Sequence, residues 1–301
     1  MTRPGPVTDT STAPAVLAGT STLLIGPPGT GKTTSLVTFI EAGLELFVTV
    51  TDPNGVESLL RAMQLHDLPM DRLHWQYIPA ASAPWEALIE AAVTISNLSY
   101  EGLTKIKSGV RKSDYRQFLD LYSSFANFTC DRTGEEFGPI DLWGPERAHA
   151  LDGISGTSTM VLELMIGGKP IAHEGEYGVA MQAQMCMLRK LCSDLRCFRV
   201  AVGHVEREPD MLTGAPKIMV SALGKKNAPK LPKDYSDVVL CEREGTKFTW
   251  SNITPNTDLK AGVLPLAAGL KPTFVQVVEK WQKWSAALDV PLTQTPHQET
   301  S

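Results

Sequence analysis

The chain has 301 residues, of which 43% are hydrophobic and 20% are charged. This is the composition of an ordinary globular protein, and it excludes a collagen, a coiled coil and a chain disordered throughout. The 28 Lys and Arg against 33 Asp and Glu give a net charge of −5. A wholly basic DNA-coating protein is therefore excluded, whereas a local basic patch is not.

The five cysteines form no C-x-x-C pair, so the sequence predicts neither a disulfide framework nor a zinc ribbon. A reduced, cytoplasmic compartment fits this usage of cysteine best. The first 18 residues are rich in Thr, Pro and Ser and lack the apolar stretch of a signal peptide. No run reaches the roughly 18 apolar residues of a membrane span, so we expect no membrane association.

Short apolar runs alternate with longer helical patterns along the chain. The runs predict strands at Ser21–Ile25, 44–50, 149–152, Phe198–Gly203, 238–241 and 247–250. Helical spacing predicts helices at 35–43, 85–93, 115–122, 179–192 and 274–287. The intervals between the first four strands are long enough for crossover helices, so we predict an α/β fold with a mostly parallel sheet flanked by helices.

The organisation predicted from these patterns is one large domain. We expect a disordered arm at 1–18, a single domain at 19–290 and a disordered tail at 291–301, because the two ends offer little to bury. The helical patterns of 83–143 predict a helical insertion at one edge of the core. Between 153 and 178 the sequence is expected to be loop-like at 167–170 and at 173–177.

A complete phosphate-loop motif, G-x-x-x-x-G-K-[ST], follows the first predicted strand and precedes the first predicted helix. The glycines let the backbone wrap around an anion, and Lys32 can place a cation on the β- and γ-phosphates. The Thr33 hydroxyl is suited to bind Mg²⁺. We therefore expect ATP and Mg²⁺ as ligands. The predicted nucleotide-binding residues are Gly26, Pro27, Pro28, Gly29, Thr30, Gly31, Lys32, Thr33 and Thr34.

Two aspartates end predicted strands and are candidates for the chemistry beside the phosphate loop. Asp152 is the candidate Mg²⁺ carboxylate, with a helix-capping role as the alternative. Asp52 is the candidate catalytic base, and Glu57 in the next helix is a weaker substitute. The alternative for Asp52 is a plain turn, because Asp-Pro-Asn-Gly is a turn-forming sequence.

His204 and a lysine-rich segment follow the fourth predicted strand. Ligands of parallel sheets bind beyond the carboxyl ends of the strands, so His204 is expected to face the phosphates and sense ATP. Its alternative is a histidine satisfied by a nearby backbone group. A polar stretch with hairpin chemistry comes next, and residues 215–233 hold five lysines and no acid. This segment suits a DNA backbone or a neighbouring subunit's nucleotide, with a solvated loop as the alternative. These lysines are Lys217, Lys225, Lys226, Lys230 and Lys233.

The motifs in this order resemble phage-encoded RecA-like P-loop ATPases of the single-strand annealing and recombination type, which consist of a RecA core only. The resemblance rests on the phosphate loop, the Leu-Asp-Gly-Ile-Ser motif at 151–155, the strand end at His204 and the segments 222–237 and 258–266. It covers about residues 20 to 285, apart from 83–143. Gly153 stands where AAA+ proteins place a catalytic Glu, which weighs against that class. RecA-like proteins instead carry a Glu near the position of Asp52, so the shorter Asp departs from their pattern.

The resemblance implies a RecA-type core that binds ATP and Mg²⁺ and acts on single-stranded DNA in phage recombination, annealing or replication. It places the DNA at loops after Asp152 and after His204. It also implies a homo-oligomer with nucleotide at the subunit interface, a single-strand-binding protein as a partner, and the host cytoplasm as the location. Lys32, Asp52, Asp152 and His204 are the expected catalytic residues. The alternatives are a nucleotide-dependent switch or assembly factor with little turnover and, less favoured, a small-molecule kinase.

Overall fold

The computed structural model describes residues 17–79, 81, 84–97, 99, 102, 115–167, 172–209, 214, 216–224 and 227–288. The predicted tail lies outside these residues, and of the predicted arm only Leu17 and Ala18 are described. The carbonyl of Ala18 accepts a hydrogen bond from Trp281 Nε1 at 2.9 Å.

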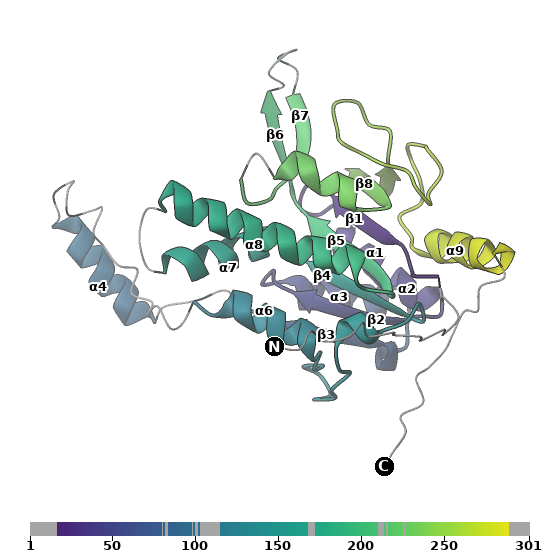
Figure 1. Ribbon diagram of the computed structural model, residues 1–301, viewed down its shortest axis with the longest axis horizontal. Helices are drawn as coiled ribbons and strands as arrows, with labels where there is room; N and C mark the ends of the chain where they lie inside the picture. Colours follow the sequence, from purple (N-terminus) through teal and green to yellow (C-terminus); the bar gives the residue numbers. More distant parts are fainter. Residues whose placement is uncertain are drawn as a thin grey trace, which may run out of the picture.

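A sheet of seven strands forms the centre of the molecule, in the order β3-β2-β4-β5-β1-β8-β9 (Figure 1). Neighbouring strands pair in parallel except β8 and β9, which are antiparallel. The sheet confirms the predicted α/β fold with a mostly parallel sheet flanked by helices. The strands are β1 (Ser21–Ile25), β2 (Glu45–Val50), β3 (Leu73–Tyr77), β4 (Arg147–Asp152), β5 (Phe198–Gly203), β8 (Asp237–Glu244) and β9 (Lys247–Ser251).

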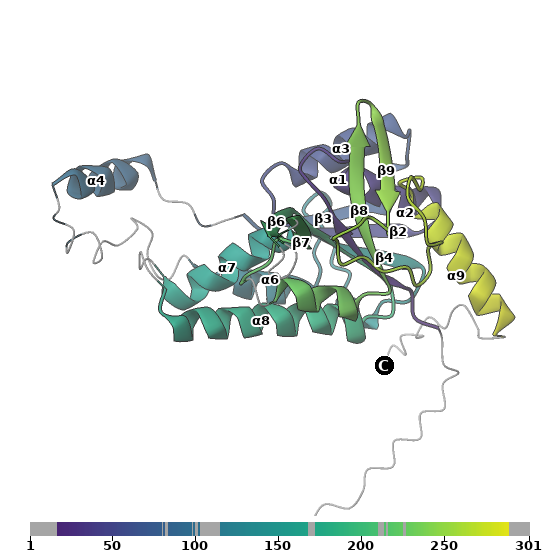
Figure 2. The same cartoon turned by 90° about the horizontal axis from the view of Figure 1, so that it is seen from above.

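Helices cover both faces of the sheet, as Figure 2 shows from above. One face carries α1 (Lys32–Leu36), α2 (Thr38–Glu41), α3 (Gly55–Leu65) and α9 (Val275–Ala287). The other carries α6 (Gln117–Ala126), α7 (Ile154–Ile166) and α8 (Glu174–Ser193). The helix α4 (Trp85–Ser96) extends away from the sheet in both views. Of the helices that the structure describes, none has the length and apolar content to cross a membrane.

The alternation of side chains along each strand divides the hydrophobic core into two clusters. Leu23 and Ile25 of β1 join the cluster beneath α6, α7 and α8, whereas Leu24 between them joins the cluster on the opposite face. Because successive strand residues point to opposite faces, a strand buried on both sides is apolar at most of its positions. This is why the inner strands were recognisable as short, mostly apolar runs.

The remaining described elements are short. The strands β6 (Val205–Pro209) and β7 (Pro216–Val220) form an antiparallel hairpin, as the polar stretch after His204 predicted. Three 3₁₀ helices are η1 (Met70–Arg72), η3 (Ile140–Leu142) and η4 (Ala228–Asp234). Within the predicted insertion at 83–143, the structure has α4, α6, η3 and an isolated bridge between Thr129 and Glu136.

The structure differs from the sequence predictions in three places. The strand β3 was not predicted, because Leu-His-Trp-Gln-Tyr is not an apolar run. Within the described part of the chain it is an edge strand, with β2 as its one neighbour in the sheet. The loop expected at 173–177 is the first turn of α8, where the backbone amide of His173 donates to the Glu176 carboxylate at 3.1 Å. This capping box starts a helix in spite of the glycines that follow. The segment directly after Asp152 is also helical, since α7 begins at Ile154, so no loop for DNA follows at that point.

Candidate functional site

The phosphate loop connects β1 to α1 with backbone conformations that only glycine adopts easily. Gly29 and Gly31 have φ angles of +72° and +80°, in the left-handed region. A Cβ on Gly26 would lie 2.6 Å from the Cys241 carbonyl oxygen, and one on Gly31 would lie 3.1 Å from Phe248 Cδ1. No side chain among the described residues caps the start of α1. The loop amides are therefore available to an anion.

Lys32 is folded back onto this loop. Its Nζ donates to the carbonyl oxygens of Gly26 and Pro27, both at 2.8 Å, and only 6% of the residue is exposed. Burial lowers the pKa of the Lys32 ammonium below its ordinary value, and nearby acidic groups oppose that shift. Two neutral carbonyls hold the cation in place without neutralising it. Its charge therefore remains available to a phosphate in the loop.

Thr33 and Asp152 meet although they are far apart in the sequence. The Thr33 hydroxyl donates to Asp152 Oδ2 at 2.9 Å, and the aspartate is buried at the end of β4. Burial raises the pKa of the Asp152 carboxyl to about 6, although the hydrogen bond from Thr33 acts in the opposite direction. A buried carboxylate beside a hydroxyl is a donor set that suits Mg²⁺. The two residues thus fit the expected metal.

Asp52 and His204 face each other across the same site. His204 Nε2 lies 3.7 Å from Asp52 Oδ2, and each side chain is 36% exposed. The Asp52 carbonyl accepts from the Gly55 amide at 3.0 Å, so the turn predicted as the alternative role does form. The carboxylate is not used by that turn. On the other side, His204 Nδ1 is buried and has no hydrogen-bond partner among the described residues.

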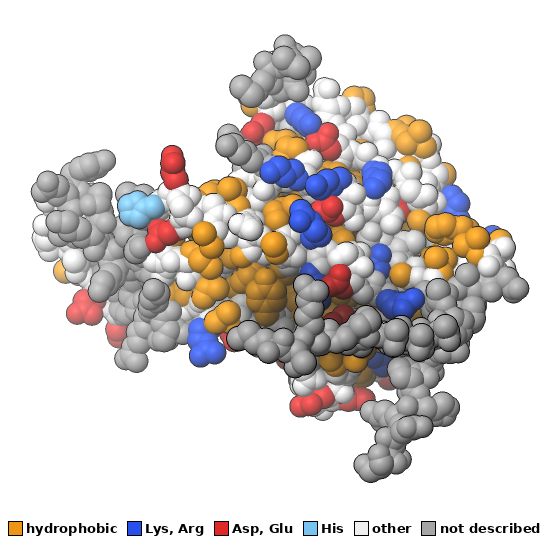
Figure 3. All heavy atoms as spheres, viewed as in Figure 1, with side chains coloured by type: hydrophobic (Ala, Val, Ile, Leu, Met, Phe, Trp, Pro, Cys, Tyr) orange, Lys and Arg blue, Asp and Glu red, His pale blue; other side chains and the backbone are white. Residues whose placement is uncertain are grey.

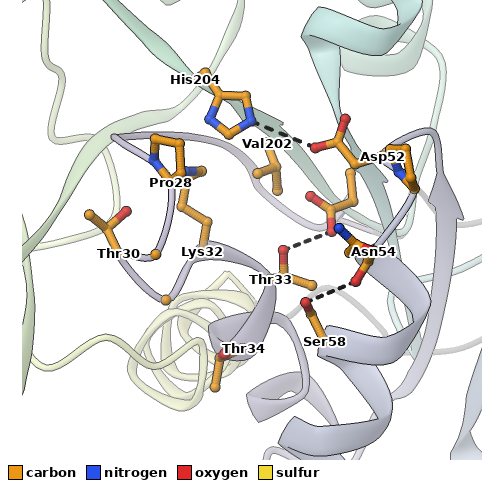
Figure 4. Close-up of a pocket in the computed structure, with 15 residues that line it drawn as sticks. Pro28, Thr30, Lys32, Thr33, Thr34, Asp52, Asn54, Ser58, Val202 and His204 are labelled. Atoms are coloured by element: carbon orange, nitrogen blue, oxygen red, sulfur yellow. Dashed lines mark hydrogen bonds and ion pairs between the residues drawn. The ribbon is translucent and has the colours of Figure 1, made fainter.

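These groups line one cavity of about 600 Å³ at the edge of the sheet where β2, β4, β5 and β1 end (Figure 4). Strand order explains the convergence, because the four strands are consecutive neighbours and all run parallel. The sequence did not identify part of the lining, although the Asp-Pro-Asn-Gly turn was a signal for it. These residues are Pro53, Asn54, Gly55, Ser58 and Val202.

Glu57, the substitute base, does not line the cavity. Its carboxylate pairs with Arg61 at 2.7 Å on an exposed face of α3. Across the described residues, no group of three or more His, Cys, Asp or Glu side chains could hold a metal ion. A metal in this cavity would therefore depend on Thr33, Asp152, the phosphates and water.

Of the lysines of 215–233 that the structure describes, none lines the cavity. Lys217 pairs with Asp258 at 2.8 Å, whereas Lys230 and Lys233 are exposed on η4. Lys225 and Lys226 fall outside the described residues. Figure 3 shows Lys and Arg side chains gathered over the η4 region with acidic side chains among them. The surface is therefore a mixed one rather than an unbroken basic patch.

No protein-family model matches this sequence, and no curated protein matches it. Among solved structures, the chain is similar to the RadB recombinase, with 13% identity and a TM-score of 0.38 over 85% of this chain and 86% of that one. It is also similar to the flagellar accessory protein FlaH from Methanocaldococcus jannaschii, with 10% identity and a TM-score of 0.33 over 84% of this chain and 83% of that one. Likeness at this level carries no argument about activity or partners, which rest on the site itself.

Proposed function

We propose that this protein binds ATP with Mg²⁺ and hydrolyses it at the cavity beside the phosphate loop. The observation that carries the proposal is the hydrogen bond between Thr33 and Asp152 at 2.9 Å, with Lys32 in the same cavity. Together these three residues provide a hydroxyl, a carboxylate and a cation around one anion-binding loop. That is the set of groups needed to hold a metal–triphosphate complex.

The residues of the loop bind and orient the triphosphate. The amides of 29–34 face the phosphates, and the Lys32 ammonium exchanges its contacts with the Gly26 and Pro27 carbonyls for phosphate oxygens. Thr33 and Asp152 hold Mg²⁺, which when bound neutralises charge that develops on the phosphates. Burial of Lys32 and Asp152 excludes water around them, so each contact is stronger than it would be in solvent.

Asp52 and His204 act at the terminal phosphate. Asp52 accepts a hydrogen bond from the attacking water and takes its proton as the water oxygen bonds to the γ-phosphorus, while the bond to the leaving ADP oxygen breaks. His204 lies 3.7 Å from that carboxylate and holds it in position. His204 also lines the cavity, so its imidazole is placed near the γ-phosphate and the attacking water.

The test compares the wild-type chain with Lys32→Ala in calorimetric titrations with ATP and Mg²⁺ and in a phosphate-release assay. Loss of ATP binding and of turnover is expected, because the cation at the phosphates is removed. Lys280→Ala is the matched control, since that lysine is exposed on α9 and outside the cavity. A Lys32→Ala protein that hydrolyses ATP at the wild-type rate would disprove the proposal.

A second candidate function is a nucleotide-dependent switch or assembly factor with little turnover. It is favoured by the contact between Asp52 and His204, because a carboxylate engaged by an imidazole is a weaker base for water. Single-turnover measurements separate the two functions. Bound ATP that is recovered unhydrolysed after many minutes supports the switch, whereas release of phosphate from most of the protein within that time supports the ATPase.

We further propose single-stranded DNA as the partner, in phage recombination, annealing or replication. The support is the lysine-rich, acid-free segment 215–233 and the exposure of Lys230 and Lys233 on η4. Fluorescence anisotropy with labelled single strands over a salt series tests this partner. Lys230→Ala/Lys233→Ala is expected to weaken binding and to lower the slope of log K against log salt concentration by about 1.4, since each phosphate contact on a single strand contributes about 0.7. The matched control is Lys280→Ala/Lys283→Ala on the exposed side of α9, and equal effects of both pairs would count against a DNA site here.

A further inference from the structure

Phe248 is an aromatic side chain that packs against the phosphate loop from a neighbouring hairpin. It belongs to β9, and a Cβ on Gly31 would lie only 3.1 Å from its ring. The guanidinium of Arg243, on the partner strand β8, covers the ring at 5.4 Å from its centroid. The residue is nevertheless 38% exposed, so part of the ring is open to solvent beside the loop.

The cavity has two chemically different ends. Asp52, Asp152 and His204 lie at one end, which is where the terminal phosphate of a nucleotide would be attacked. Figure 4 shows Thr34 on the far side of Thr33 from Asp52 and His204. A nucleoside triphosphate with its γ-phosphate at the acidic end must therefore extend its ribose and base past Gly31 and Thr34. This is the side on which Phe248 contacts the loop.

The groups beside Gly31 suit a planar ligand. Arg243 is held in place by a hydrogen bond from its Nε to the Gly245 carbonyl at 2.8 Å, so it supports the ring from one side. An aromatic ring backed by a guanidinium can stack on a base, since every base has a π-face. Stacking contacts do not distinguish hydrogen-bonding edges, but a purine covers more of a ring than a pyrimidine does.

We propose that Phe248, supported by Arg243, is the base-stacking residue of the nucleotide site and that it favours purine nucleoside triphosphates over pyrimidine ones. This inference rests on the proposed nucleotide-binding function. It adds the hairpin of β8 and β9 to the site as the wall that contacts the base. Adenine and guanine bind equally well at such a wall.

Calorimetric titrations of the full chain with ATP, GTP, CTP and inorganic tripolyphosphate, all with Mg²⁺, test the proposal. Phe248→Ala and Phe248→Leu are expected to weaken ATP and GTP binding by about 5-fold to 100-fold, the range of base stacking on one aromatic side chain. Phe248→Tyr keeps the ring and is expected to retain wild-type affinity. Tripolyphosphate has no base, so its affinity is expected to be the same in all four proteins.

The matched control is Trp284→Ala, because Trp284 is an aromatic residue of α9 that is 53% exposed and outside the cavity. Unchanged ATP affinity in Phe248→Ala overturns the inference, and so does an equal loss for ATP and tripolyphosphate, which would mean that Phe248 only supports Gly31. Equal wild-type affinity for ATP and CTP overturns the purine preference. A wild-type chain that binds neither ATP nor tripolyphosphate instead refutes the proposed function, and this inference with it.

Discussion

The Thr51 hydroxyl donates a hydrogen bond to the Gly153 carbonyl at 2.7 Å and joins the end of β2 to the start of α7. Gly153 has a φ angle of +120°, and a Cβ there would overlap the Thr51 hydroxyl and lie 2.8 Å from Asp52 Oδ1. No side chain therefore fits directly after Asp152. This packing explains why the position cannot carry a catalytic glutamate. The candidate base, Asp52, instead lies two residues after the end of β2.

Gly153→Ala is expected to lower the free energy of unfolding by more than about 2 kcal/mol, because it combines an unfavourable φ with a steric clash. Urea denaturation of the free protein measures the effect. Gly178→Ala is the matched control, since its Cβ meets nothing within 4 Å in α8 and should stabilise the helix by about 0.5–1 kcal/mol. Similar unfolding curves for the two variants would contradict this account of Gly153.

Asp52→Asn is expected to lower kcat for ATP hydrolysis by about 10²–10⁴-fold and to leave the Kd for ATP within a few-fold, because an amide cannot take the proton from water. Stopped-flow phosphate release and calorimetry measure the two quantities. The control is Glu57→Gln, whose parent side chain pairs with Arg61 outside the cavity. If Glu57→Gln lost activity and Asp52→Asn kept it, the assignment of the base would be wrong.

Asp237→Asn is expected to lower the free energy of unfolding by about 3 kcal/mol. The fully buried carboxylate accepts hydrogen bonds from the amides of Gly262, Val263 and Leu264 at 3.0–3.2 Å, and an amide side chain cannot accept at both of its terminal atoms. Chemical denaturation checks the value. Glu244→Gln, exposed at the end of the same strand, should change stability by less than about 0.5 kcal/mol.

The buried imidazole of His149 is expected to make the free energy of unfolding depend on pH. Burial lowers the pKa of its imidazole to about 3, against about 6.5 in an unfolded chain. Between these two pKa values the unfolded chain binds a proton at His149 that the folded protein does not bind. The stability gained by keeping the imidazole neutral is therefore fully present above pH about 6.5 and is lost as the pH falls toward 3. In His149→Gln the free energy of unfolding should fall less steeply with decreasing pH, by up to about 1.4 kcal/mol per pH unit. Urea denaturation from pH 7 to pH 4 measures both slopes, and parallel curves would refute the prediction.

The inner strands and the phosphate loop could be predicted because their signals are local. The runs at β1 and β5 are mostly apolar, since both faces of these strands are buried. The edge strand β3 has one partner and carries His74, Trp75 and Gln76, so its sequence has no such run. The start of α8 was mistaken for a loop because Gly175 and Gly178 outweighed the capping contact of His173 with Glu176 in the sequence pattern.

The sequence by itself determined the strand–loop–helix of the phosphate site, because glycine conformations, the lysine and the hydroxyl all lie within nine consecutive residues. It also indicated Asp52, Asp152 and His204 as strand-end residues, but not their distances. Only the tertiary structure decided that β2, β4, β5 and β1 lie side by side, which brings these residues into one cavity. It also placed Phe248 against Gly31 and excluded a side chain at Gly153. Contacts of this kind depend on the order and register of strands far apart in the chain, and no local pattern of residues encodes them.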